Sequence, residues 1–524
     1  MRLVLSIGAA LLLLAPLSSI QGQKKFSGVK SSYLRAIKKS DFKAQTIAIT
    51  SMVATNDPGA VEAFLETLTK LRRKDQKLED KKKRAQDEID ETRFKRIIKP
   101  RMDAGARQET RKLVEKQLVP QKKIVSKCTK DLEHDAKVRA ALRQGLRDLK
   151  KSLSDDTHAA LSRFGINHVK RIKEPKSLVS ALDDLAAIGT KGTLAQIAEK
   201  TLLSAYPAVR TAALNALALH PCNISEDAAL SALDDDFQQV QLAALEVLQK
   251  TGSERCIAPL IARLPNEKGR IKDHIRKTLK SLTGADFHDN VALWTNFWKE
   301  WKDDFSGRGR TARVMGWNDT AKARQQQQQA RSRRPGGTAF YGIQTKAKDI
   351  VYILDISGSM EAQAGGKEKG YTRMKQAVAE LIGSIRKLNK KCTFNIIFYH
   401  SSVSIWKKKM QAANKKNKEE AIVWARKVTT RGRTNIFDSL ELAFKIAGRG
   451  TFDKGYLPAV EAIFLLSDGW PNEGRIKAPP EILTEVRKLN KLSKLELNTI
   501  ALGGANKLMQ QLARQNNGVC VHVQ

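Results

Sequence analysis

Short apolar runs alternate with amphipathic stretches through the last third of the chain. Residues 349–354 and 462–466 are largely apolar, which is typical of strands buried on both faces. Helices are expected between and after these runs, at residues 372–391, 419–428, 439–447, 480–492 and 506–515. The other expected strands are residues 392–399, 403–406, 496–502 and 518–523. This alternation predicts an α/β domain with a mostly parallel central sheet, covered by helices on both faces.

The middle of the chain has a different period. Apolar positions recur there every 31 residues, and each unit carries a second apolar stripe, so we expect two helices per repeat. One set of equivalent positions is Leu182, Ala213, Ala244 and Ile275. Such pairs bury their apolar faces against their neighbours, which predicts an all-α helical-repeat region. The alternative is an irregular helical domain without a regular superhelix. The pattern resembles HEAT-like repeats over about residues 175–285, with residues 57–65 as a divergent earlier copy.

Composition divides the rest of the chain. Residues 23–174 are expected to form a charged helical region. Its stretch from Glu66 to about Leu153 is dense in charged side chains with widely spaced apolar positions, which predicts a charged helical hairpin broken at Pro100 and Pro120. The repeat region, residues 175–305, ends in a Trp-rich stripe that we expect to act as its cap. Residues 306–344 are rich in Gln, Arg and Gly and read as a basic linker, because such a composition buries little apolar surface.

The amino-terminal segment, residues 1–22, has the form of a secretory signal. An early cation is followed by an apolar stretch and then by small residues. The alternative is an uncleaved membrane anchor. We therefore expect a secreted, periplasmic or cell-envelope protein. The five cysteines cannot all pair internally. Cys222 and Cys256 lie where neighbouring repeats would bring them together, and an oxidising compartment would permit a disulfide, but we expect two buried thiols.

The net charge of the chain is +39, spread along its length. A field of this sign attracts polyanions, and for a secreted protein these are anionic envelope polymers or membrane surfaces. We do not expect nucleic acid as a partner, because no basic segment is interleaved with aromatic residues. The alternative is that the charge belongs to a solvated, Lys-rich surface.

Oxygen-bearing side chains follow both apolar runs of the α/β domain. Three lie directly after the first run, one lies after the second, and one lies in a Gly-containing loop before a helix. They are Asp355, Ser357, Ser359, Asp468 and Thr434. The carboxyl ends of parallel strands meet at one edge of a sheet, so we expect these side chains to converge there. Oxygen ligands suit Mg²⁺, and this set leaves room for water and one outside ligand.

This arrangement resembles the von Willebrand factor A domain with an intact metal-ion-dependent adhesion site. The resemblance covers about residues 345–524 and implies a Rossmann-like α/β fold. It also implies that Asp355, the two serines and Thr434 lie at or near a Mg²⁺ ion, with Ca²⁺ or Mn²⁺ as alternatives, while Asp468 acts through water. A carboxylate of a partner protein would fill the vacant position. Many relatives have Gly-Gly before the Thr, whereas this chain has Gly432-Arg433. Arg433 would face an acidic partner or simply be solvated.

No catalytic constellation is recognisable in the sequence. The eight histidines are scattered, and Ser467 lacks the flanking glycines of a nucleophile elbow. We therefore expect a binding or adhesion protein rather than an enzyme. It would engage an acidic residue of a protein partner through the cation, with the helical repeats as scaffold. One alternative is a structural envelope protein in which positive charge dominates binding to polyanions. Another is a regulatory subunit of an ATP-driven complex.

Overall fold

The computed structural model describes residues 26–57, 59–93, 96, 104–152, 172–303, 305, 338–365 and 370–523. The chain forms two compact units. The first comprises Met1–Ile172 with Ala187–Thr193, and the second comprises Lys173–Ala186 with Leu194–Gln524. The expected signal segment, most of the expected basic linker and Pro100 lie outside the described residues.

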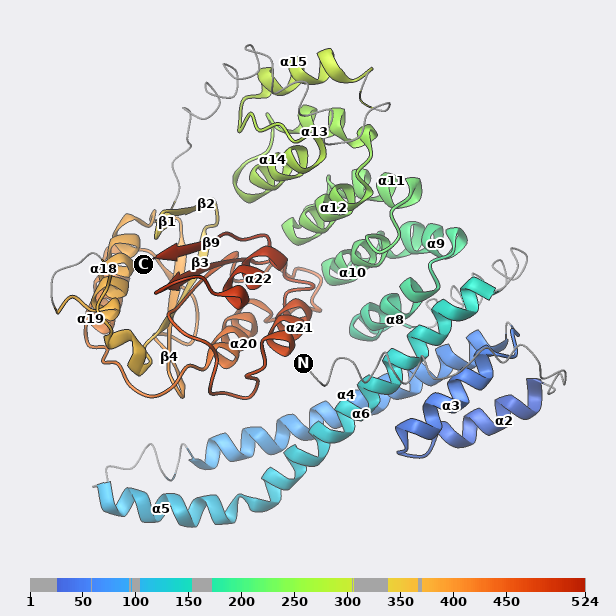
Figure 1. The fold of residues 1–524 in the computed structure, drawn as a ribbon, viewed down its shortest axis with the longest axis horizontal. Helices are drawn as coiled ribbons and strands as arrows, with labels where there is room; N and C mark the ends of the chain where they lie inside the picture. The colour runs from blue at the N-terminus through green and yellow to red at the C-terminus, as the bar shows by residue number, and fades with distance from the viewer. Residues whose placement is uncertain are drawn as a thin grey trace. The chain divides into compact units, whose positions relative to one another are not determined.

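The first unit is helical in its described part, and two long helices, α4 and α6, pack along each other in opposite directions (Figure 1). Its helices are α2 (Phe26–Ile37), α3 (Phe42–Val53), α4 (Gly59–Arg93), α5 (Ala104–Gln117) and α6 (Val119–Ser152). Tyr33 is fully buried, donates a hydrogen bond to Thr67 Oγ1 at 2.7 Å and packs on the Phe64 ring. Pro120 is the second residue of α6, where its missing N–H costs no helical hydrogen bond.

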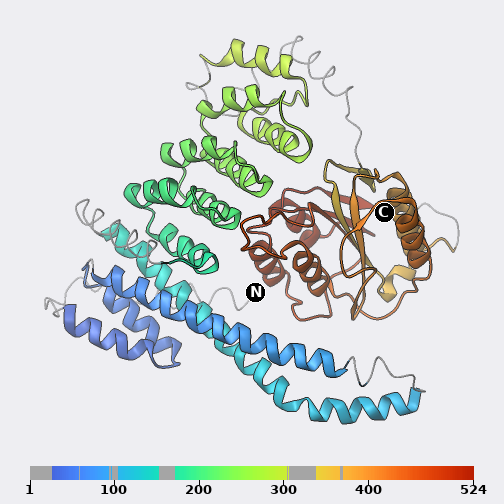
Figure 2. The same cartoon turned by 180° about the vertical axis from the view of Figure 1, so that it is seen from behind.

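Helix pairs stack on one another in the first part of the second unit (Figures 1 and 2). The stack consists of α8 (Pro175–Ile188), α9 (Lys191–Thr201), α10 (Pro207–Leu217), α11 (Asn223–Ala232), α12 (Gln238–Thr251), α13 (Ile257–Arg263), α14 (Gly269–Thr283) and α15 (Val291–Trp301). The 31-residue period corresponds to buried positions on successive first helices, since Val209, Val240 and Ile271 are each at most 3% exposed. Each pair therefore buries its apolar face against the next. The assignment to HEAT-like repeats stays a prediction.

The stack ends in the aromatic helix α15, and it contains two of the cysteines considered in the sequence. Trp294 on α15 is fully buried and meets the Phe287 ring edge-on at 4.9 Å, whereas Trp298 is half-buried. Cys222 and Cys256 are free thiols. Cys256 is buried as expected, but Cys222 is only half-buried, because it precedes α11 in a turn where its Sγ lies 3.4 Å from Ser225 Oγ.

Within the described part of the chain, the helices lack the combination of length and apolarity needed to span a bilayer.

The second part of this unit is built on a seven-stranded sheet with the order β5-β4-β3-β7-β8-β9, and β6 also pairs with β4. The strands are β3 (Asp349–Asp355), β4 (Thr393–Tyr399), β5 (Val403–Ile405), β6 (Gln411–Ala412), β7 (Ala462–Ser467), β8 (Glu496–Leu502) and β9 (Cys520–Val523). β3, β4, β7, β8 and β9 are parallel, and β5 and β6 are antiparallel to β4. We call the end where the parallel strands begin the amino edge and the other end the carboxyl edge.

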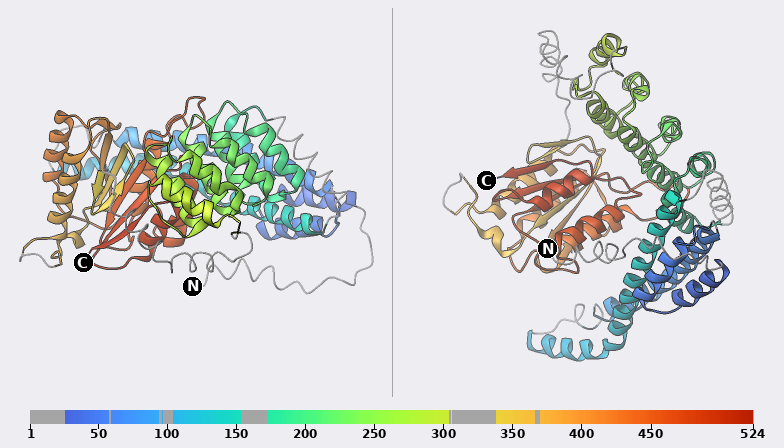
Figure 3. Two further views of the ribbon diagram at one scale, coloured as in Figure 1. Left: turned by 90° about the horizontal axis from the view of Figure 1, so that it is seen from above. Right: turned by 45° about the vertical axis from the view of Figure 1, so that its right-hand side comes forward.

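Helices cover both faces of this sheet (Figures 1 and 3). One face packs on α18 (Arg373–Lys387) and α19 (Lys415–Arg426), and the other on α20 (Ile436–Ala447), α21 (Pro479–Leu489) and α22 (Lys507–Gln515). Successive residues of β3 point to opposite faces, so Tyr352 joins the first core and Val351 the second. The prediction of a helical region followed by a mostly parallel α/β domain is confirmed. A hairpin of β1 (Thr338–Phe340) and β2 (Ile343–Thr345) also precedes the sheet.

Candidate metal-binding site

The five oxygen-bearing residues expected from the sequence meet at the carboxyl edge of the sheet. Asp355 is the last residue of β3, Ser357 is the N-cap residue of the short helix Gly358–Glu361 that follows, and Ser359 lies within this helix. Asp468 directly follows β7, the neighbour of β3. Thr434 lies immediately before the cap of α20. Parallel pairing of β3 with β7 therefore brings residues more than a hundred positions apart into one site.

Asp355 is fully buried, and both of its carboxylate oxygens accept hydrogen bonds. Oδ1 accepts from the Ser357 backbone N–H at 2.8 Å, and Oδ2 accepts from the Ser467 hydroxyl at 2.8 Å and from the Tyr399 hydroxyl at 3.2 Å. Burial raises the pKa of Asp355 to about 6, the hydrogen bonds from Ser357 and Ser467 oppose this rise, and the nearby Asp468 adds to it. The carboxylate is thus fixed in place but poorly compensated for the loss of water.

A chain of oxygens joins the two serines to Asp468. Ser357 Oγ lies 3.1 Å from Ser359 Oγ, which donates to Asp468 Oδ1 at 2.7 Å. Neighbouring ligands of an octahedral Mg²⁺ at 2.0–2.1 Å lie about 3 Å apart. The spacing and the all-oxygen composition of the group therefore fit such an ion. Among the described residues, no group of three or more His, Cys, Asp or Glu side chains could hold a metal, so this mixed group of hydroxyls and carboxylates is the candidate.

Thr434 is held by the loop that follows β7. Its backbone N–H donates to Asn472 Oδ1 at 2.8 Å, and its carbonyl accepts from the Asn472 backbone N–H at 3.1 Å. Its hydroxyl oxygen lies 3.7 Å from the position that a Cβ would occupy at Gly469. Gly432 has a φ of +69°, and a Cβ there would lie 2.8 Å from Ser401 Oγ, so this position requires glycine. Where many relatives have Gly-Gly before the Thr, this chain thus keeps glycine at the position whose backbone conformation requires it.

Arg433 is an exposed residue at the rim of the site. Its side chain is 69% exposed, and Nη1 lies 4.0 Å from Glu473 Oε2, at the outer limit of an ion pair. Its backbone N–H donates to Ser401 Oγ at 3.0 Å, which fixes the loop but leaves the guanidinium in solvent. The side chain is therefore available to an incoming acidic group and is not part of the oxygen cluster.

Arg373, at the start of α18, contacts the site and was missed by the sequence reasoning. Its Nη1 donates to Asp468 Oδ2 at 3.1 Å, and the Asp468 side chain is fully buried. Gly503, with a φ of +74°, makes room for it, because a Cβ there would lie 2.3 Å from Nη2. The site thus contains a resident cation beside one of its two carboxylates. A basic residue at the second position of an expected helix gave no sign of this contact.

Tyr399 and Ser467 were also missed as site residues. Both end strands next to β3, and both donate to the Asp355 carboxylate. Their positions were within reach of the sequence, because polar residues at the carboxyl ends of strands flanking the Asp355 strand must lie beside it. Ser467 had been considered only as a nucleophile, whereas its hydroxyl orients a buried carboxylate.

Comparisons with known proteins concern this part of the chain. Residues 349–524 match the family model of the von Willebrand factor type A domain. Inter-alpha-trypsin inhibitor heavy chain H3 of Mesocricetus auratus is 28% identical over 182 residues, or 34% of this chain and 19% of that protein. Heavy chain H4 of Sus scrofa is 30% identical over 143 residues, or 27% of this chain and 14% of that protein. The chain thus covers less than a fifth of the length of these relatives.

Solved structures with related folds include a von Willebrand factor type A protein from Catenulispora acidiphila. The likeness has 18% identity and a TM-score of 0.29, over 35% of this chain and 40% of that chain. The PilB minor pilin from Streptococcus sanguinis is similar at 14% identity and a TM-score of 0.26, over 35% of this chain and 58% of that chain. The parallel sheet between two layers of helices agrees with the match to the family model, and residues 349–524 form a von Willebrand factor type A (VWA) domain.

Proposed function

We propose that the VWA domain is a protein-binding module that grips a carboxylate of its partner through a divalent cation at the carboxyl edge. Asp355, Ser357, Ser359 and Thr434 would hold the cation, with Asp468 beside them. Mg²⁺ suits this set, and Ca²⁺ or Mn²⁺ could replace it. The observation that carries the proposal is the chain of oxygens from Ser357 through Ser359 to Asp468, spaced 3.1 and 2.7 Å apart.

The side chains of the proposed cation site have different roles in binding the ion. Asp355 is buried and short of compensating charge, so it favours a cation. Tyr399 and Ser467 orient its carboxylate by donating to Oδ2. Ser359 is exposed and marks the side from which a partner approaches. When bound, the cation supplies an open coordination position that an outside carboxylate can fill. No acid, base or nucleophile is required for this task, and we propose that the protein is not an enzyme.

The rim of the site favours an acidic partner. Arg431 and Arg433 are exposed in the loop before Thr434. Cations at a binding rim accelerate encounters with negatively charged partners and suppress encounters with basic ones. The similar inter-alpha-trypsin inhibitor heavy chains are consistent with a role in binding other proteins. We further propose an extracytoplasmic location, either secreted or in the cell envelope, with the helical repeats as scaffold.

Binding to polyanions is the second candidate function. Helix α4 exposes a basic stripe made of residues spaced three or four apart, which lie on one face of a helix. The stripe consists of Lys70, Arg73, Lys74, Lys77 and Lys81. The whole chain has a net charge of +39, and together with this charge the stripe suits an anionic envelope polymer or membrane surface. This mode predicts binding that weakens steeply with salt and ignores chelators. A regulatory role in an ATP-driven complex has no comparable feature in its favour.

Calorimetric titration of Mg²⁺ into the full chain tests the proposed function. We expect saturable binding that Asp355→Ala abolishes, because the buried carboxylate is the centre of the ligand set. Asp349→Asn, at the other end of the same strand, is the matched control and should bind Mg²⁺ as the unaltered protein does. Equal binding by the Asp355 variant and the unaltered chain would refute the site. Partner capture with and without EDTA then separates metal-bridged binding from binding by charge alone.

A further inference from the structure

Polar contacts join the amino edge of the VWA domain to the helix stack. On the VWA side they come from the turns before β7, β8 and β9, opposite the proposed cation site. On the stack side they come from the first helix of successive pairs. The stack residues, which we call the docking face, are Asp183, Asn215, Gln239, Glu246, Arg270 and Lys277.

Lys494 is the central side chain of this contact. It lies in the turn before β8, its side chain is 9% exposed, and its Nζ reaches Glu246 Oε2 at 2.5 Å and Asn215 Oδ1 at 2.7 Å. The neighbouring Lys491 pairs with Asp183, and its carbonyl accepts from Asn215 Nδ2 at 2.9 Å. A lysine that is buried to this extent needs both partners, since its ammonium group has lost most of its water.

Arg270 is a cation of the stack that contacts the VWA domain. It belongs to α14 of the stack, is 5% exposed and donates from Nη2 to the Lys494 carbonyl at 2.6 Å. Burial lowers the pKa of Arg270, and this shift is opposed by the carboxylates of Glu461, Glu496 and Asp349 at the amino edge and of Asp273 on its own helix. Two lysines of the VWA domain thus pair with acids of the stack, and a buried arginine of the stack lies near acids of the VWA domain. Complementary charge of this kind selects one orientation and penalises others.

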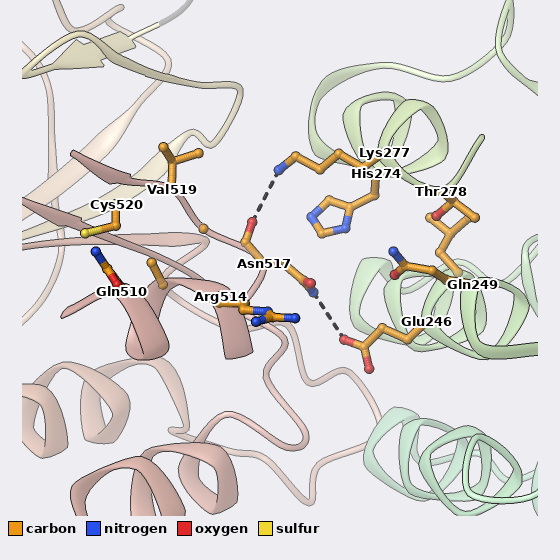
Figure 4. Close-up of a pocket in the computed structure, with 13 residues that line it drawn as sticks. Glu246, Gln249, His274, Lys277, Thr278, Gln510, Arg514, Asn517, Val519 and Cys520 are labelled. Carbon is orange, nitrogen blue, oxygen red and sulfur yellow. Dashed lines mark hydrogen bonds between the residues drawn. The ribbon is translucent and has the colours of Figure 1, made fainter. Parts of the chain in front are cut away.

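Lys277, Asn517 and Glu246 line a hollow of about 330 Å³ between the two parts (Figure 4). Lys277 donates to the Asn517 carbonyl at 3.3 Å, and Asn517 Nδ2 donates to Glu246 Oε1 at the same distance. Gln239 is 1% exposed and donates to the Tyr456 carbonyl at 2.7 Å. These contacting groups are polar and would be hydrated after separation. The interactions that join the two parts are thus ion pairs and hydrogen bonds.

We propose that the docking face holds the VWA domain of the same chain in a reversible, salt-sensitive clasp that leaves the carboxyl edge free. The clasp goes beyond the proposed metal function and does not require it. While it is closed, the docking face is covered by the chain itself and cannot scaffold a second partner. A protein that bound this face would have to compete with the amino edge.

Zero-length carbodiimide crosslinking of the full chain tests the clasp. The monomer should yield a Lys494–Glu246 crosslink, identified by mass spectrometry, because the two groups are in contact. Lys494→Glu should lower the yield of crosslinks between the two parts by at least about tenfold and enlarge the radius of gyration, since like charges at an interface cost several kcal/mol. Combining it with Glu246→Lys should restore the crosslink between the same positions. Lys488→Glu, on an exposed lysine that pairs only within α21, is the matched control.

Each outcome decides the proposal. A missing Lys494–Glu246 crosslink in the unaltered monomer, or a crosslink found only in dimers, would overturn it. So would an unchanged yield in the single reversal or no recovery in the double reversal. Scattering of the unaltered protein between 0.1 and 1 M salt gives a test that needs no variant, because the Debye length falls from about 10 to about 3 Å. The protein should expand. Mg²⁺ titration of every variant separates this result from the metal function.

Discussion

The two edges of the VWA sheet place different groups around their carboxylates. Both edges gather carboxylates where parallel strands begin or end. At the amino edge, Asp349 and its neighbours lie near a guanidinium from the helix stack, Arg270, although burial raises the pKa of Asp349 as well. At the carboxyl edge, Asp355 is surrounded by hydroxyls, and only Asp468 has a resident cation, Arg373. An edge whose carboxylates lie near a guanidinium of the same chain is suited to holding a fixed partner. An edge left short of positive charge is suited to an exchangeable cation.

Removing one threonine hydroxyl from each edge gives the largest expected contrast. Thr434→Val should weaken Mg²⁺ binding by at least about tenfold, the lower end of the loss seen when groups supporting a metal are removed. Thr393→Val, which removes the donor to Asp349 Oδ1 at the amino edge, should leave Mg²⁺ affinity unchanged. Calorimetry measures both constants. If both variants lost affinity for Mg²⁺ to a similar degree, the result would contradict binding of the ion at the carboxyl edge.

The resident cation at the carboxyl edge offers a smaller test with the opposite sign. Arg373→Gln should raise Mg²⁺ affinity several-fold, up to about tenfold or ~1.4 kcal/mol, because a positive charge beside Asp468 repels the ion. Arg433→Gln is the matched control, and its effect should be smaller because solvent screens this exposed side chain. Calorimetric Mg²⁺ titration compares the two variants. Unchanged or weaker binding in the Arg373 variant would show that the arginine supports the site and does not compete with the ion.

The smallest expected effect is an acid response at the docking face. Burial lowers the pKa of His274 well below 6.5, with Lys277 and Arg270 on its own helix and Lys494 of the VWA domain adding to the shift. Glu246 and Arg514 line the same hollow. Neutral His274 therefore supports the closed clasp fully above about pH 6.5, and this support is lost as the pH falls, because the opened form takes up the proton more readily.

Solution scattering between pH 7.5 and 5.5 measures this response. The unaltered chain should open progressively on the acid side, whereas His274→Asn should show a flatter profile. An identical profile in both proteins would assign the acid response to other groups of the hollow.

Much of the fold followed from apolar patterning, and the reasons for the gaps are local. The strand at Asp349–Asp355 was predicted to within one residue, because a run buried on both faces is apolar throughout. Helix α19 begins at Lys415, four residues before its expected start, because its first turn is polar and is capped by the Asn414 side chain. The hairpin of β1 and β2 was not predicted, since three-residue strands are too short to show a period.

The candidate site was predictable where side chains follow strands and unpredictable where a distant helix contributes. Asp355, Asp468 and Thr434 converge as expected, because strand order and the turn before α20 bring them together. Arg373 reaches Asp468 through the packing of α18 and the open space at Gly503, which no local pattern encodes. The contacts of Lys494 with the stack depend on the tertiary arrangement alone. Sequence spacing therefore predicted which oxygen-bearing side chains come together, but not the charged groups that surround them.

Strand β3 has a mechanical consequence if the domain grips a partner as proposed. It runs from Asp349 at the docked edge to Asp355 at the proposed cation site, about 20 Å at 3.3 Å per residue. A pull on a partner would enter the chain at Asp355 and travel along the axis of this strand. Its parallel neighbours β4 and β7 would oppose the pull by shearing their hydrogen bonds together. The strand thus connects the proposed cation site with the edge of the sheet that lies beside the stack.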